Sequence, residues 1–182
     1  MSDGLVDLVI EEPAWTEFLP EIEALAETAA QLALETAGLD PERWTICLLA
    51  CDDARIAGLN RDFRARAAPT NVLSWPAFEL APERPGGLPA APPQSAAGPR
   101  QSLGDVAIAL QTTHREAGDS ATPLKDHVIH LILHGCLHLL GFDHEAEEDA
   151  ETMEGIETRA LARIGVADPY TRGDAGQSHP DR

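Results

Sequence analysis

The sequence predicts a single domain built from alternating β-strands and α-helices. Its 182 residues fit one domain, because domains commonly contain roughly 100 to 200 residues. Four short apolar segments with strand character are separated by segments in which apolar residues recur at helical spacing. We therefore expect one domain over residues 1–170 and a disordered tail over residues 171–182.

The first half of the chain contains two predicted strand–helix pairs. Residues 5–10, LVDLVI, are apolar and β-branched and predict a strand, and residues 20–38 follow with helical spacing. Residues 44–50, WTICLLA, predict a buried strand, and residues 54–64 predict a helix that two preceding aspartates can cap. Three residues lie on one face of this second helix: Ile56, Leu59 and Phe63.

Two further strands enclose an unusual segment. Residues 71–75, NVLSW, predict a third strand, and residues 103–110, LGDVAIAL, predict a fourth that a short helix at residues 111–117 follows. Residues 81–102 between these strands are rich in Pro, Gly and Ala and cannot add much to a core. We predict a long mobile loop here, either a tolerated insertion or a lid that faces the substrate.

The helix predicted from Pro123 to Gly141 carries several histidines on one face. At about 100° per residue, four of them share a narrow stripe. Two histidines that are four residues apart can bind one metal ion, and two such pairs exist within the stripe. The four histidines are His127, His130, His134 and His138.

The way in which the chain leaves this helix favours the second pair. Gly141 lets the backbone turn out of the helix, so that His144 can return toward His134 and His138. Three imidazoles and one open coordination position are typical of a catalytic zinc site, so we expect one Zn²⁺ per chain. Imidazole also suits nickel and copper. Two histidines are left to line the cleft or to pack: His127 and His130.

The residue that follows the first ligand separates this site from the common zinc peptidases. In H-E-x-x-H peptidases a glutamate at this position is the general base, whereas this chain has Gly135. Three neutral ligands leave the metal charge uncompensated, which suits an anionic substrate such as a phosphodiester. A metallopeptidase is the weaker alternative because it needs a base from elsewhere. Two candidates for a base in any hydrolysis are Asp105 and Asp143.

A local cluster of arginines supplies positive charge in an acidic chain. The chain has 13 basic and 31 acidic residues and a net charge of −18, which excludes a general nucleic-acid-coating protein. Residues 55–70 nevertheless contain four arginines and one acid, and a guanidinium matches phosphate oxygens. The alternative to a phosphate-binding cluster is a solvated helix end, where positive charge is favourable at the C-terminus. The arginines are Arg55, Arg61, Arg64 and Arg66, and the neutral donors that follow are Thr70, Asn71 and Ser74.

Four motifs together resemble the YbeY family of bacterial endoribonucleases and ribosomal RNA maturation factors. HGCLHLLGFDH at residues 134–144 is similar to the histidine signature of that family. LNRDFRARAAPTNVLSWP at residues 59–76 and LGDVAIA at residues 103–109 resemble two further family segments, in the same order. EGIETRALARIGVADPY at residues 154–170 resembles the last helix of the family.

The resemblance implies an α+β single domain in which about five helices pack on a four-stranded mixed sheet, with a three-histidine cleft like that of zinc hydrolases. It implies that His134, His138 and His144 are the metal ligands and that Arg64 is the catalytic arginine. The implied activity is metal-dependent, single-strand-specific endoribonuclease action in 3′ maturation of small-subunit ribosomal RNA and in ribosome quality control. The alternative is a metal-containing ribosome-assembly factor without nuclease activity.

The acidic surface of the chain bears on its partners. Residues 145–157 contain seven acids directly after the last proposed ligand, so a ribosomal protein or an assembly GTPase with a basic surface is expected to help deliver ribosomal RNA on the small subunit. The first residues, MSDGLVDLVIEEP, contain no export signal. Residues 128–142 form the longest apolar window and are too short for a membrane span. We expect a cytoplasmic protein without a membrane partner.

Overall fold

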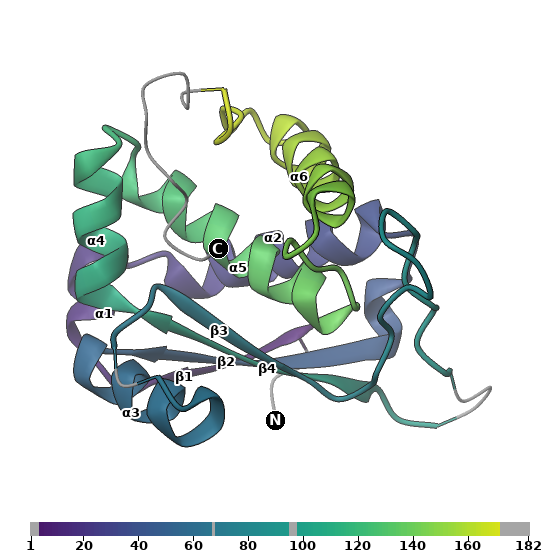
Figure 1. The fold of residues 1–182 in the computed structure, drawn as a ribbon. Coiled ribbons are helices and arrows are strands. Elements are labelled where there is room, and N and C mark those ends of the chain that lie inside the picture. The colour runs from purple at the N-terminus through teal and green to yellow at the C-terminus, as the bar shows by residue number, and fades with distance from the viewer. Residues whose placement is uncertain (1–3, 67, 95–97, 172–182) are drawn as a thin grey trace.

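A four-stranded sheet lies at the centre of the computed structural model, which describes residues 4–66, 68–94 and 98–171 (Figure 1). The strands β1, β2 and β4 are parallel to one another, and β3 is antiparallel to β4 at one edge. The prediction of a four-stranded mixed sheet is therefore confirmed. In spatial order the strands are β1 (Val6–Ile10), β2 (Trp44–Cys51), β4 (Gln101–Ala109) and β3 (Val72–Pro76).

Six α-helices pack around the sheet in the part of the chain that the structure describes, where about five were expected. The sequence pattern did not reveal α1 or a 3₁₀ turn at Pro41–Arg43, because both are too short to show helical periodicity. The helices are α1 (Ala14–Phe18), α2 (Ile22–Thr36), α3 (Asp53–Arg64), α4 (Leu110–Asp119), α5 (Leu124–Leu139) and α6 (Glu147–Ala162).

The helix α5 is held between the sheet and two other helices. In Figure 1 it lies with α2 and α6 on one side of the sheet, and α3 covers the opposite side. A Cβ atom added at Gly135 would lie 2.8 Å from Cγ1 of Val106, so α5 approaches β4 too closely for a side chain at this position. Because the core fixes α5 on both sides, the histidines on its remaining face have a rigid support.

The helix α3 ends beside the edge strand β3. The carboxylate of Asp52 caps its start by accepting a hydrogen bond of 2.7 Å from the Arg55 backbone N–H, as the sequence predicts. Ile56 is buried on the inner face of the helix. Phe63 follows on that face but is 66% exposed, because it lies beside β3, where the sheet ends. Its ring packs edge-on against Trp75, with centroids 5.5 Å apart.

The segment between β3 and β4 has neither helix nor strand in residues 77–94 and 98–100. Leu80 is buried within it, so part of the segment is packed against the domain. Its mobility stays a prediction, and the predicted tail lies outside the described residues from position 172 onward. Among the helices that the structure describes, none combines the length and hydropathy needed to cross a membrane.

Candidate metal centre and active site

The histidine stripe predicted on α5 is confirmed by the positions of the rings. The centroids of successive rings along the stripe are 6.4, 6.2 and 4.6 Å apart. The shortest separation is that between His134 and His138, whose Nε2 atoms lie 3.0 Å apart. Helical spacing allowed two pairs, His130 with His134 and His134 with His138, and the structure brings the second pair into closer contact.

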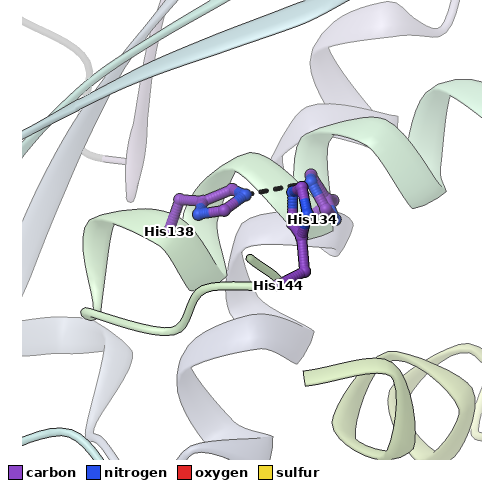
Figure 2. Close-up of side chains that lie close together, drawn as sticks. All are labelled: His134, His138 and His144. Atoms are coloured by element: carbon purple, nitrogen blue, oxygen red, sulfur yellow. Dashed lines mark hydrogen bonds between the residues drawn. The ribbon is translucent and has the colours of Figure 1, made fainter. Parts of the chain in front are cut away.

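The loop after α5 brings a third histidine to this pair. Gly141 has a φ of +90°, and a Cβ atom there would lie 2.7 Å from the carbonyl carbon of Leu80, so the turn requires glycine. The loop then folds back, and Oδ1 of Asp143 accepts a hydrogen bond of 2.8 Å from the backbone N–H of His144. The His144 ring lies 5.1 Å from that of His134, and Figure 2 shows the three rings gathered at the end of α5.

The three imidazoles fit a metal ion. One ring nitrogen from each of His134, His138 and His144 lies within 4.8 Å of the other two. Tetrahedral zinc with Zn–N bonds of about 2.0–2.1 Å holds its ligand nitrogens about 3.3 Å apart, which is close to the spacing between His134 and His138. Three convergent nitrogen donors are therefore present without rearrangement of the main chain.

A buried carboxylate behind the site orients the first histidine. Glu157 of α6 is 0% exposed, and its Oε1 lies 2.6 Å from Nδ1 of His134. Burial alone would raise the pKa of Glu157, but hydrogen bonds from His130 and His134 outweigh burial and lower it. The ionised carboxylate keeps the proton of His134 on Nδ1, so the lone pair of Nε2 faces His138 and His144.

Glu157 also binds the end of the described chain. Its Oε2 accepts hydrogen bonds from the Tyr170 hydroxyl and, at 3.3 Å, from Nε2 of His130. The three residues His130, His134 and Glu157 could by themselves hold a metal ion. Because their polar atoms already satisfy one another, we interpret this group as the support of His134 rather than as a second metal site.

Burial keeps the second proposed ligand neutral. Desolvation, followed by the neighbouring rings of His134 and His144, lowers the pKa of His138 to about 3. A neutral imidazole is the form that binds metal, because protonation would occupy the donor lone pair. His138 is therefore ready to bind a metal ion at neutral pH.

An open cavity joins the histidines to the arginine cluster. Its volume is about 1030 Å³, at the upper end of the roughly 300–1,000 Å³ of small-molecule sites, and it is lined by the three histidines together with Arg64 and Arg66. The other two arginines form ion pairs, Arg55 with Glu11 at 3.0 Å and Arg61 with Asp62 at 3.2 Å. The structure thus brings two of the four predicted arginines to the histidines.

The predicted neutral donors have structural partners. Ser74 lines the cavity, but its hydroxyl donates a hydrogen bond of 3.1 Å to the carbonyl of Gly135 and so ties β3 to α5. The Asn71 amide donates to Oε2 of Glu116 at 3.1 Å. Both side chains therefore position the edge strand beside the cavity.

The two candidate bases lie on different sides of the sheet. Asp143 lines the cavity near the histidines. Asp105 is paired across the sheet with Trp75, whereas its neighbour Val106 faces α5. Because successive side chains of a strand point to opposite faces, Asp105 points away from the metal site, and its prediction as a base is wrong.

Sequence reasoning missed Glu157 and Tyr170 as parts of the site. Glu157 counted as one of several acids that follow the last ligand, and Tyr170 only as the last residue of the predicted domain. A signal did exist, because Glu157 is three or four residues from the apolar residues Met153, Ala160 and Leu161 on the buried face of α6. A carboxylate on such a face requires a partner, since an unpaired buried charge is costly.

Comparison with known proteins shows the family of this chain. Residues 10–165 match the family model described as Endoribonuclease YbeY. A protein named Endoribonuclease YbeY from Ruegeria pomeroyi is 54% identical to this chain, and one of the same name from a Jannaschia species is 49% identical. Both alignments cover 91% of this chain, and they cover 98% and 99% of those two proteins. A solution structure from Thermotoga maritima shares the fold, with a TM-score of 0.50 and 16% identity over 97% of this chain and 99% of that one. The chain belongs to the endoribonuclease YbeY family.

Proposed function

We propose that this protein is a metal-dependent endoribonuclease that cuts single-stranded RNA in the cavity beside α5. The observation that carries the proposal is the position of three convergent histidines in one open cavity with Arg64 and Arg66. Similarity to proteins named as endoribonucleases supports RNA as the substrate.

The chain supplies charge and orientation for phosphodiester cleavage. A metal ion held by His134, His138 and His144 would act as a Lewis acid toward the phosphate or a water molecule. Arg64 is the proposed catalytic residue, because it lines the same cavity and its guanidinium can stabilise charge on the nonbridging oxygens. Glu157 holds the Nδ1 proton of His134 and so keeps the first ligand in one tautomer.

The metallopeptidase alternative is not favoured by the packing of α5. A peptidase of the H-E-x-x-H type needs a glutamate where this chain has Gly135. At that position a Cβ atom would be 2.8 Å from Val106 and 3.2 Å from Ser74. The sheet therefore leaves no space for the general base of that mechanism, and family membership favours the nuclease over an assembly factor without activity.

The finer assignments extend this function. Zn²⁺, one per chain, is the proposed metal because three imidazoles suit zinc and no thiolate belongs to the group. The proposed substrate is the 3′ end of small-subunit ribosomal RNA, and ribosome quality control is the proposed setting, which requires a cytoplasmic location. A ribosomal protein or assembly GTPase with a basic surface would complement the acids that follow His144.

The proposal is tested by measuring RNA cleavage and metal content on the same preparations of four proteins. These are the wild type, His138→Ala, Arg64→Glu and Arg61→Glu. Arg61 is the matched control, because it lies on the same helix and pairs with Asp62 instead of lining the cavity among the described residues. We expect about one zinc per chain and cleavage of a short single-stranded RNA by the wild type and by Arg61→Glu.

The two site variants should fail for different reasons. His138→Ala should lose both metal and cleavage, whereas Arg64→Glu should keep the metal and lose cleavage by at least about 100-fold, as expected for loss of a charge that stabilises the transition state. Equal cleavage by all four proteins would identify a contaminating nuclease and overturn the proposal. Folding of each variant is verified by circular dichroism.

A further inference from the structure

An exposed aromatic pair lies beside the cavity and takes no part in the site described so far. Phe63, on the last turn of α3, is the most exposed phenylalanine of the chain and is 66% exposed. Its ring meets that of the half-buried Trp75 on β3 at 69°, with centroids 5.5 Å apart. Two aromatic rings that gather at the surface beside a charged cavity can mark a binding site.

The pair adjoins the part of the cavity that suits an RNA backbone. Phe63 directly precedes Arg64, and Trp75 lies between Ser74 and Pro76 on β3. Arg64, Ser74 and Pro76 all line the cavity. Because strand residues alternate, Trp75 points to the other face of the sheet from Ser74, so the pair lies on the α3 side of the edge strand β3.

We propose that Phe63 and Trp75 form a stacking platform for an unpaired base of the RNA whose phosphates run along Arg64 and Arg66. The inference rests on the proposed function and adds a subsite to it. Aromatic rings bind bases of single strands by stacking, which any base can satisfy. A base within a duplex is already stacked between its neighbours, so the platform selects single-stranded RNA.

The charges around Phe63 and Trp75 orient the RNA strand. Arg64 and Arg66 lie on the cavity side and attract phosphates. Asp105, which is the cross-strand neighbour of Trp75, is exposed on the platform side and repels them. The backbone is therefore held at the edge of β3, and the base, which carries no charge, reaches past the edge to the rings.

The tryptophans of the chain provide a direct test. Trp15 and Trp44 are 0% exposed, so Trp75 is the tryptophan that a ligand can reach. The metal-loaded full chain is titrated with a 2′-O-methyl RNA of about six nucleotides, and electrophoresis of the RNA after the titration verifies that it is uncut. The fluorescence of tryptophan reports stacking, and the anisotropy of a dye on the RNA reports binding independently.

We expect the single strand to quench Trp75, and the duplex of the same sequence and an abasic strand of the same length to leave its emission unchanged. The variant Trp75→Phe should bind RNA without any change in tryptophan emission. Phe63→Ala should weaken binding of the single strand by about 5- to 150-fold, as expected for one stacked base. Its affinity for the abasic strand should equal that of the wild type.

The matched control is Phe18→Ala. Phe18 is also exposed, at 52%, but its ring packs on His114, and neither of its chain neighbours is among the described residues that line the cavity, whereas Phe63 directly precedes Arg64. This variant should bind RNA like the wild type. If Phe63→Ala and the wild type bind the single strand equally, or if RNA fails to quench Trp75, the platform is refuted even when cleavage is intact. If the base-dependent loss occurs in a protein that does not cleave, the platform stands and the nuclease proposal fails.

Discussion

The Glu157 carboxylate lies 2.6 Å from Nδ1 of His134 and joins α6 to the proposed metal site. This contact places a fully buried charge directly behind a ligand, where it determines which ring nitrogen carries the proton. The first ligand is thus prepared by a residue that is 23 positions away in the chain.

Replacement of this carboxylate should weaken metal binding. In Glu157→Gln the neutral amide no longer stabilises the proton on Nδ1 of His134, so we expect zinc affinity to fall by about 10- to 100-fold. Competition with a chromogenic chelator measures the affinity. The control is Glu151→Gln, which changes an exposed acid on the same helix and should leave the affinity unchanged. Equal affinities in the two variants would contradict a role for Glu157 in orienting the ligand.

A side chain at Gly135 should destabilise the domain. In Gly135→Ala the new methyl group would be 2.8 Å from Val106 and would push α5 from the sheet, at a cost of about 1–3 kcal/mol. Urea denaturation measures the loss. Gly155→Ala is the control, because its nearest contact is the mobile end of Arg159 at 3.5 Å, and it should be stabilised by about 0.5–1 kcal/mol. A stable Gly135→Ala would show that α5 does not depend on this close approach.

The turn at Gly141 should control the third ligand. Gly141→Ala combines an unfavourable φ of +90° with a Cβ that would be 2.7 Å from the carbonyl carbon of Leu80. Gly38→Ala has a similar φ of +82° and no atom within 4 Å, so it isolates the conformational cost, which is about 1–2 kcal/mol. We expect Gly141→Ala to lose more stability than Gly38→Ala and, through displacement of His144, also to lose zinc affinity. Full zinc affinity in Gly141→Ala would be inconsistent with this role.

The carboxylate of Glu116 should make the domain sensitive to acid. Burial raises its pKa, but hydrogen bonds from His127 and Asn71 outweigh burial, so the pKa lies below the usual value of a glutamate. A carboxylate with a lowered pKa in the folded state stabilises the protein above its unfolded pKa, and this stability is lost as pH falls through the folded value. Wild type should therefore lose stability below about pH 4.5 more steeply than Glu116→Gln in urea denaturation series. Parallel curves for the two proteins would exclude this contribution.

The local patterns predicted most of the site because its ligands are close in sequence. His134 and His138 are one helical turn apart, and Gly141 provides the turn toward His144, so the group could be assembled without tertiary information. The four strands and the helices α2, α3 and α5 were also predicted from their apolar residues, and the structure confirms them.

The parts that the sequence did not reveal depend on long-range packing. Glu157 and Tyr170 meet His130 only after α6 has folded across α5, and no periodicity indicates that pairing. The orientation of Asp105 likewise depends on which face of β4 packs on α5, which the strand pattern left open because β4 is buried over most of its length. Phe63 has the helical spacing of the buried face of α3, but it is exposed because β3 beside it is an edge strand.

The connection between β3 and β4 contains a loop whose two ends meet beside the cavity. Ala90 donates a backbone hydrogen bond of 3.0 Å to the carbonyl of Leu80, so the chain returns to its starting point after residues 81–89. Leu80 itself packs against the Gly141 turn and lines the cavity. Apart from Gly86, whose backbone N–H donates a hydrogen bond of 2.7 Å to Asp149, residues 81–89 can therefore change in length or composition while Leu80 keeps its place. The same segment is therefore a suitable place to insert a reporter tag.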